Sequence, residues 1–211
     1  MATAGRFITF EGIDGCGKTT QIQHLSMYLR AQTNREVVET VEPGGTSIGQ
    51  QARKILLDPA NSDICPRAEL LLYFASRAQN VEEIIRPALH RHATVLCDRF
   101  TDSTLVYQGA GRGIDAETVL ALDRIACNGL EPDVTILIDI DLETSLERAR
   151  SRNSEGNQSE SRIDDESTVF HARVRDGYLA LAKAHPGRIV VVDGRASIPT
   201  VGERIREALN V

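Results

Sequence analysis

The chain has 211 residues, of which 41% are hydrophobic and 26% are charged. This composition is typical of a globular protein, and no run approaches the roughly 20 apolar residues of a membrane span. The net charge of −6 argues against a nucleic-acid-binding surface, so we expect neither a membrane nor a nucleic acid as partner. A strand is predicted almost at the first residue, so we expect no cleaved signal peptide. The four cysteines lack C-x-x-C spacing, which predicts reduced thiols in a cytoplasmic protein rather than disulfides or a zinc site.

Short apolar runs alternate with longer helical patterns along the whole chain. The predicted strands are Phe7–Phe10, Val37–Thr40, Thr94–Cys97, Val134–Ile138 and Ile189–Val192. The predicted helices are Thr19–Ala31, Ser47–Leu57, Ala68–His90, Ala116–Cys127, Leu142–Arg150, Ser167–Ala184 and Pro199–Leu209. This rhythm predicts one α/β domain over residues 1–211, with a central five-stranded parallel sheet between two layers of helices. Ligands of such sheets bind beyond the carboxyl ends of the strands.

The segment after the first strand matches a phosphate-binding loop. Gly12, Gly17, Lys18 and Thr19 fit the pattern G-x-x-x-x-G-K-[ST], and a predicted helix follows. In such a loop the N–H groups and the helix N-terminus face phosphate oxygens, the lysine reaches the β- and γ-phosphates, and the threonine hydroxyl binds Mg²⁺. Cys16 lies inside the loop. A reactive thiol is one interpretation, but we favour the other, in which Cys16 is simply a small residue that fits there. We expect a nucleoside triphosphate to be bound by Gly12, Ile13, Asp14, Gly15, Cys16, Gly17, Lys18, Thr19 and Thr20.

Two segments between the second and third strands carry further candidates. The sequence EPGGT, residues 42–46, predicts a tight turn at the rim of the ligand crevice. On the next predicted helix, Phe74 and Arg77 are three residues apart and share a face. A ring beside a guanidinium could stack on a flat base and bond to its edge, whereas an ordinary core position for Phe74 is the alternative.

The third strand ends in Asp98 and Arg99. An acid at this position, opposite a phosphate loop, helps to hold Mg²⁺, and the arginine could grip a second phosphate. The next segment, TDSTLVYQGAGRG, offers polar side chains to a small ligand, although a glycine-rich loop without a ligand is the alternative. Its candidate ligand contacts are Ser103, Tyr107, Gln108 and Arg112.

Residues 151–161, SRNSEGNQSES, are polar and break the rhythm, which predicts a surface loop. Next to a phosphate loop, we interpret residues 150–165 as a mobile lid that brings arginines over the transferring phosphates, although a solvated loop is the alternative. The arginines in or beside the segment are Arg148, Arg150, Arg152 and Arg162, and we take Arg148 and Arg152 as the catalytic candidates together with Lys18 and Arg99.

Together these motifs resemble those of bacterial thymidylate kinases, a family of P-loop nucleoside monophosphate kinases. FEGIDGCGKTT, EPGGT, LLYFASRAQ, DRF-x-DS and VYQGAGRG occur in that family's order, and RIDDES and VRDGY resemble the end of its lid and the next helix. The resemblance implies a P-loop kinase fold and a homodimer. It also implies transfer of the γ-phosphoryl group of ATP–Mg²⁺ to thymidine 5′-monophosphate (dTMP), which gives ADP and thymidine diphosphate (dTDP) for dTTP synthesis.

The resemblance further implies roles for single residues. Phe74 would stack on thymine, and Arg77 would bond to the base edge. Arg99 would hold the acceptor phosphate, Tyr107 would crowd the 2′ position of the sugar, and Asp14 would lie near its 3′-hydroxyl side. Ser103 and Gln108 would line the base pocket, and Thr19 and Asp98 would hold the metal.

The chain departs from the family pattern at two positions. Val41 stands where an arginine often precedes EPGGT, so any support for the acceptor must be missing or come from elsewhere. Asn80 stands where a histidine often follows the RAQ motif. Gly15 and Cys16 occupy the part of the phosphate loop that carries an arginine in one variant of the family, so the chain fits the variant that supplies arginine from the lid.

Three other functions remain open from sequence. A kinase for another nucleoside monophosphate or for a deoxynucleoside would use the same loop. A GTPase switch would need an Asn-Lys-x-Asp run, which the chain lacks. A non-enzymatic ATP-binding module would leave the second pocket unexplained.

Overall fold

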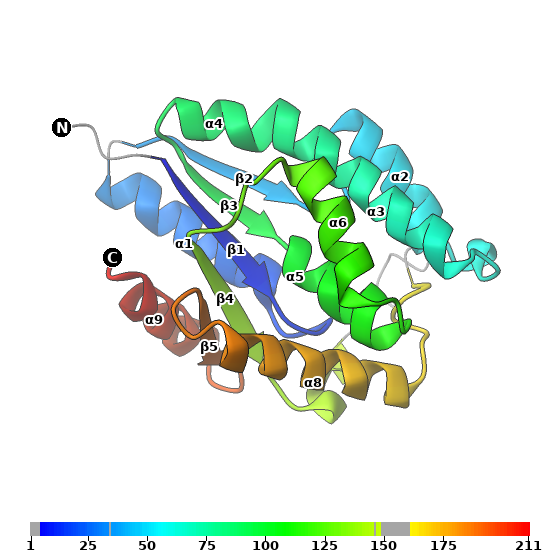
Figure 1. The fold of residues 1–211 in the computed structure, drawn as a ribbon. Helices are drawn as coiled ribbons and strands as arrows, with labels where there is room; N and C mark the ends of the chain where they lie inside the picture. Colours follow the sequence, from blue (N-terminus) through cyan, green and yellow to red (C-terminus); the bar gives the residue numbers. More distant parts are fainter. Residues whose placement is uncertain (1–4, 34, 146, 149–160) are drawn as a thin grey trace.

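The computed structural model describes residues 5–33, 35–145, 147–148 and 161–211. At its centre is a parallel sheet with the strand order β2-β3-β1-β4-β5 (Figure 1). In this sheet Phe10 of β1 lies beside Asp98 of β3 and Ile136 of β4, so the carboxyl ends of these strands meet at one edge. The strand bounds are β1 (Arg6–Glu11), β2 (Val37–Val41), β3 (Thr94–Asp98), β4 (Val134–Asp139) and β5 (Ile189–Asp193). All five predicted strands are confirmed, each to within a residue at either end.

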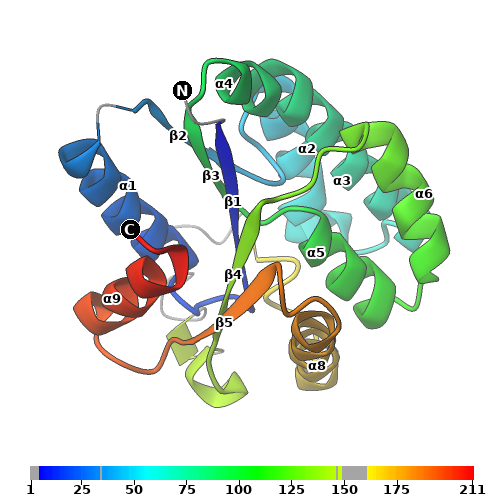
Figure 2. The ribbon, with the colours of Figure 1, turned by 60° about the vertical axis from the view of Figure 1, so that its left-hand side comes forward.

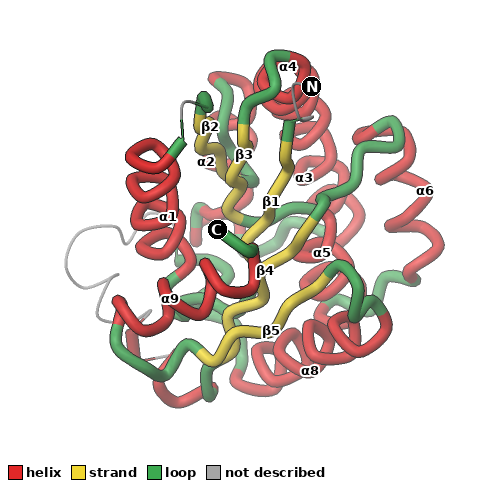
Figure 3. The backbone as a smooth tube through the Cα atoms, turned by 90° about the vertical axis from the view of Figure 1, so that its left-hand side faces the viewer, coloured by secondary structure: helices red, strands yellow, loops and turns green. Residues whose placement is uncertain are grey.

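Helices cover both faces of the sheet (Figures 2 and 3). One face carries α1 (Lys18–Gln32) and α9 (Ile198–Leu209), and the opposite face carries α3 (Pro66–Asn80), α4 (Arg86–His90), α6 (Ala116–Cys127) and α8 (Thr168–Ala184). The helix α2 (Ser47–Leu57) packs against α3. The predicted α/β/α layering is therefore confirmed.

The predicted helix Ala68–His90 is interrupted. Between α3 and α4 the chain forms a π-helical turn, η2 (Val81–Ile85). Pro87 lies at the start of α4 and has no N–H to continue an α-helical ladder, which favours a local change of hydrogen-bond pattern there.

The segment after β3 is helical rather than a glycine-rich loop. The short helix α5 (Thr101–Thr104) continues as a π-helix, η3 (Leu105–Gly111). A Cβ atom on Gly111 would lie 2.6 Å from Cε2 of Phe170. Gly111 is therefore required for the close packing of η3 against α8, and not for the approach of a ligand.

The two faces of β1 lie in different environments. Ile8 and Phe10 pack into the apolar cluster that includes side chains of α1 and α9, whereas Phe7 packs with Phe74 and Phe100 on the other face. Glu11 also lies on the Phe7 side of the strand and is fully buried. A buried carboxylate at a strand end needs hydrogen-bond donors, and it lies beside the candidate site.

In the described part of the chain, no helix is long and apolar enough to cross a bilayer. The predicted helix Leu142–Arg150 is helical at 142–145 and 147–148. Most of the predicted lid, with Arg150 and Arg152, lies outside the described residues.

Candidate active site

A cavity of about 580 Å³ opens at the carboxyl ends of β1, β2 and β3. The phosphate loop, the turn after β2, the helix α3 and the segment 98–108 contribute to its walls. The chain segments that carry the sequence motifs therefore meet around one cavity, as the topology of a parallel sheet predicts. The predicted site residues that line it are Asp14, Lys18, Thr19, Arg77, Asp98, Arg99, Ser103, Tyr107 and Gln108.

The phosphate loop is held in a form that suits an anion. The helix α1 begins at Lys18, and no side chain caps its first N–H groups. Lys18 is buried, and its Nζ donates to the carbonyl oxygens of Gly12 and Ile13 at 3.0 and 3.2 Å. A Cβ atom on Gly12 would lie 2.4 Å from the carbonyl oxygen of Ile138, so only glycine fits at this point of the loop.

Cys16 is a packing residue of the loop. Its side chain is buried, and burial raises the pKa of its thiol above the ordinary value. The protonated thiol is a weak nucleophile, which favours the small, well-fitting residue over a reactive one.

Thr19 and Asp98 bring two oxygen ligands together. The Thr19 hydroxyl donates to Oδ2 of Asp98 at 2.8 Å, across 79 residues of sequence. Mg²⁺ prefers one or two protein oxygens together with phosphate oxygens and water, and this pair fits that requirement. Among the described residues no larger group of His, Cys, Asp and Glu converges on a metal position.

Arg99 is fixed by contacts on both of its terminal nitrogens. Its backbone has a φ of 69°, which is unusual for a residue other than glycine. Nη2 contacts Oδ1 of Asp14 at 2.7 Å and the Tyr107 hydroxyl at 3.1 Å. Nη1 contacts the Gly12 carbonyl, the Ser103 hydroxyl and the Tyr178 hydroxyl, each at 3.1 Å. The structure thus brings together Asp14, Arg99, Ser103 and Tyr107, as predicted.

Glu11 is the hydrogen-bond acceptor for the backbone turn after Arg99 and for Tyr178 of α8. Its carboxylate accepts hydrogen bonds from the backbone N–H of Phe100 at 2.7 Å, from the Ser103 hydroxyl at 2.5 Å and from the Tyr178 hydroxyl at 2.7 Å. Burial raises the pKa of Glu11 above its ordinary value. No role was predicted for Glu11 from the sequence, although a glutamate inside an apolar strand is itself a signal of a buried polar network.

Arg77 is one of the largest fully buried side chains of the protein. Its Nε donates to Glu42 at 2.5 Å, and its Nη2 donates to the Phe100 carbonyl at 3.1 Å and to the Thr104 hydroxyl at 2.9 Å. Its Nη1 is buried and has no hydrogen-bond partner among the described residues. In a side chain that lines the cavity, a donor without a protein partner is a candidate for a hydrogen bond to a ligand.

Phe74 is not part of the cavity wall. Its side chain is 4% exposed and packs in the core cluster with Phe7 and Phe100, with the Arg77 guanidinium 4.9 Å above its ring. The neighbouring Tyr73 lines the cavity instead. The helical spacing that suggested Phe74 applies equally to Tyr73, because residues three and four apart both share a helix face.

Arg162 is not a candidate for contact with the phosphates. It is buried, and its Nη2 forms an ion pair at 2.8 Å with Glu69, a residue of α3 that does not line the cavity. Arg112 also pairs with Glu69 and does not line the cavity. Arg148 is exposed.

Other cavity residues were not anticipated. Arg53, on α2, lines the cavity and donates to the Pro43 carbonyl at 3.0 Å, so a guanidinium is present near Val41.

The Asn80 amide donates to Oε1 of Glu42 at 3.1 Å and accepts from the Thr40 hydroxyl at 2.8 Å. Asn80 therefore connects α3 to β2 and to the EPGGT turn, at the position where the sequence pattern often has a histidine. The Glu42–Pro43 peptide of this turn is cis.

Comparison with known proteins agrees with this geometry. A family model for thymidylate kinase matches residues 10–205. A thymidylate kinase of Geobacter sp. (strain M21) is 52% identical over 206 residues, which is 97% of this chain and 91% of that protein. A thymidylate kinase of Trichlorobacter lovleyi is 50% identical over 204 residues, which is 96% of each protein. The crystal structure of thymidylate kinase from Ehrlichia chaffeensis has a TM-score of 0.79 at 34% identity and covers 98% of this chain and 100% of that chain. The chain belongs to the thymidylate kinase family.

Proposed function

We propose that this protein transfers the γ-phosphoryl group of ATP to dTMP, which yields ADP and dTDP. An oxygen of the dTMP phosphate bonds to the γ-phosphorus, and the bond from that phosphorus to the β–γ bridging oxygen breaks as ADP leaves. The observation that carries the proposal is one cavity that combines a phosphate loop with a buried arginine, and the Nη1 of this arginine has no protein partner in the part of the chain that the structure describes. Such phosphoryl transfer depends on positioning and charge neutralisation and needs little covalent chemistry from the protein.

The phosphate loop is proposed to hold the donor. The free N–H groups at the start of α1 would bind the β-phosphate, and Lys18 would exchange its two loop carbonyls for β- and γ-phosphate oxygens. Thr19 and Asp98 would hold Mg²⁺. When bound, the metal ion neutralises charge on the phosphate oxygens.

Arginines on the opposite wall are proposed to hold the acceptor phosphate. Arg99 is pre-positioned by five contacts, and Arg53 would take the role that an arginine at position 41 has elsewhere in the family. Tyr107 donates to Oδ2 of Asp14 at 2.9 Å, which fixes its ring where it would crowd a 2′-hydroxyl. A ribonucleotide is therefore expected to be a poor acceptor.

The base is proposed to lie between Tyr73 and the polar groups of Arg77 and Gln108. Tyr73 offers the only aromatic face that α3 contributes to the cavity wall in the described chain. The Nη1 of Arg77 would donate to the O4 carbonyl of thymine. Cytosine carries an amino group at that position, so two donors would face each other.

An ADP-release assay over a panel of nucleoside monophosphates tests this function. We expect turnover with dTMP and none with thymidine, and ATP hydrolysis without an acceptor should be negligible. Phosphorylation of thymidine but not of dTMP would show a deoxynucleoside kinase. Preference for GTP with no dependence on an acceptor would show a nucleotide switch instead.

Three expectations stay predictions: the homodimer that the family resemblance implies, the cytoplasmic location that the cysteines indicate, and the catalytic roles of Arg148 and Arg152 in the lid. Sedimentation velocity at micromolar protein tests the first, with a single species at twice the chain mass of 23.1 kDa expected. Alanine variants of Arg148 and Arg152, with dTMP turnover as the readout, test the last.

A further inference from the structure

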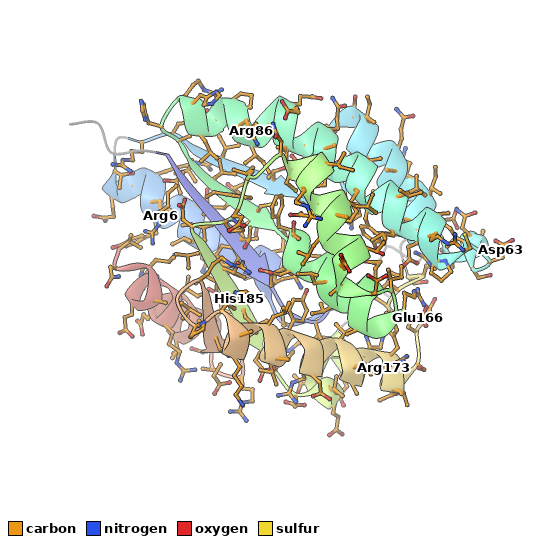
Figure 4. The ribbon with its side chains drawn as sticks, in the orientation of Figure 1. Arg6, Asp63, Arg86, Glu166, Arg173 and His185 are labelled. Carbon is orange, nitrogen blue, oxygen red and sulfur yellow. The ribbon has the colours of Figure 1, made fainter. Side chains whose placement is uncertain are left out.

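Glu69 of α3 is buried, does not line the cavity and is surrounded by N–H donors. Its Oε1 accepts from Nε2 of Gln108 at 2.9 Å and from Nε of Arg112 at 3.2 Å. Its Oε2 accepts from Nη2 of Arg112 at 3.2 Å and pairs with Nη2 of Arg162 at 2.8 Å. The donors come from η3, from Arg112 directly after it and from the segment before α8. Glu166, which is labelled in Figure 4, belongs to that last segment and pairs with Arg112 at 2.5 Å. Glu69 therefore links three segments that are far apart in sequence.

The carboxylate determines which way the Gln108 amide points. An ionised carboxylate only accepts hydrogen bonds, so the NH₂ end of the amide must face Glu69 and the carbonyl end must face away. Burial alone would raise the pKa of Glu69, but hydrogen bonds from Gln108 and Arg112 hold it below the ordinary value, so the acid is ionised at neutral pH. Among the described residues, the Gln108 side chain makes one hydrogen bond, through Nε2. Because Gln108 lines the cavity, its Oε1 is left as an acceptor for a ligand.

We propose that Glu69 is a positioning residue for base selection, because it fixes the Gln108 amide with its carbonyl oxygen toward the base. The residues that line the cavity then include a donor, Nη1 of Arg77, and an acceptor, Oε1 of Gln108. Thymine and uracil offer the complementary pair, an O4 acceptor and an N3–H donor. Cytosine offers an amino donor at C4 and an acceptor at N3. Its donor would face Nη1 of Arg77, and its acceptor would face Oε1 of Gln108. This inference rests on the proposed function and adds to it a residue that does not touch the substrate.

The variant Glu69→Gln tests the proposal, because a glutamine at position 69 can donate as well as accept and lets the Gln108 amide turn over. The readout is the ratio of kcat/KM for dTMP to kcat/KM for dCMP. We expect this ratio to fall about 5- to 100-fold, the range for one mismatched buried hydrogen bond. The ratio for dTMP to dUMP should stay unchanged, because both bases carry the same O4 and N3–H groups.

Two further variants separate positioning from general loosening of the cluster. Arg112→Gln removes an ion pair from the same carboxylate but leaves Gln108 on Glu69, so its dTMP-to-dCMP ratio should stay within about twofold of wild type. In Gln108→Ala the ratio is already low, and adding Glu69→Gln should lower it no further. If Glu69→Gln does not fold, Glu69→Asp keeps the negative charge for both arginines but withdraws the oxygens from Gln108, and it should lower the ratio in the same direction.

Each outcome decides something different. A wild-type protein without preference for dTMP over dCMP would refute the proposed function itself. A wild-type protein that prefers dTMP, together with a folded Glu69→Gln or Glu69→Asp variant of unchanged ratio, would overturn only the role of Glu69. Multiplicative effects in the double variant would also overturn it, because Glu69 would then act independently of Gln108.

Discussion

Tyr73 and Phe74 are adjacent on α3, yet the structure gives them opposite surroundings. Tyr73 lines the cavity, whereas Phe74 is 4% exposed in the core. Replacing each in turn should therefore separate substrate affinity from stability. We expect Tyr73→Ala to raise the KM for dTMP about 5- to 150-fold, since stacking of a base on an aromatic ring contributes roughly 1–3 kcal/mol. The KM for ATP should stay near the wild-type value, because the phosphate loop is unchanged.

Phe74→Leu should act on stability instead. Loss of ring packing in the core cluster, and of the contact with the Arg77 guanidinium, is expected to lower the free energy of unfolding by about 1–3 kcal/mol. The KM for dTMP should change little. Tyr73→Phe is the matched control, because it keeps the ring and removes only the hydroxyl, and its KM should lie within about twofold of wild type.

The two measurements are initial rates of ADP release at saturating ATP and urea unfolding at neutral pH. A Tyr73→Ala variant with wild-type KM for dTMP, combined with a Phe74→Leu variant of raised KM and unchanged stability, would show that Phe74 stacks on the base. That result would also refute the proposal that the base stacks on Tyr73.

Three further predictions concern other parts of the molecule. Lys18→Ala should lower kcat by at least about 10²-fold without loss of the fold, because it removes an electrostatic contact to the transferring group. Lys183 is exposed, so Lys183→Ala should leave kcat unchanged. Steady-state kinetics measure kcat, and circular dichroism checks the fold. The pKa of Glu69 is lowered in the folded protein, so the contribution of its ionised form to stability is complete above the unfolded pKa of 4.5 and is lost as the pH falls through the folded pKa. The variant Glu69→Gln lacks this titration, so its free energy of unfolding should decline less steeply below about pH 5. Urea unfolding at a series of pH values measures this. Iodoacetamide at mildly alkaline pH should modify Cys65, which is exposed, well before the buried Cys16, Cys97 and Cys127, whose pKa values are raised by burial, and peptide mass spectrometry would detect any other order.

The central strands β1, β3 and β4 were predictable because they are buried on both faces and consist mostly of apolar residues. The position of the cavity followed from the same topology, since the motifs lie directly after the strands. Spacing along α3 could not choose between Tyr73 and Phe74, because both share a face with Arg77. The choice depends on where α3 crosses the sheet, and no local pattern contains that information.

The arginines were harder to assign than the strands. A polar sequence around Arg162 suggests a solvated position, but its partner Glu69 lies 93 residues earlier in the chain. Such a long-range ion pair has no signature near either residue. The helical state of 101–111 was missed for a related reason, since the glycine that suggested a loop serves contact with Phe170.

The three arginine clusters around the cavity differ mainly in where their carboxylates lie. Glu42 holds Arg77 from the turn after β2, Asp14 holds Arg99 from the phosphate loop, and Glu69 holds Arg162 from outside the cavity. In the two fully buried pairs, Glu42–Arg77 and Glu69–Arg162, removing one partner costs roughly 3–5 kcal/mol because it leaves a buried charge without compensation. Among the described residues this pairing leaves Nη1 of Arg77 without a protein partner, at the wall where we propose that the base lies, whereas Arg162 is held outside the cavity. We therefore expect the carboxylates that hold the arginines, and not the number of arginines near the site, to determine which of them contact the nucleotide.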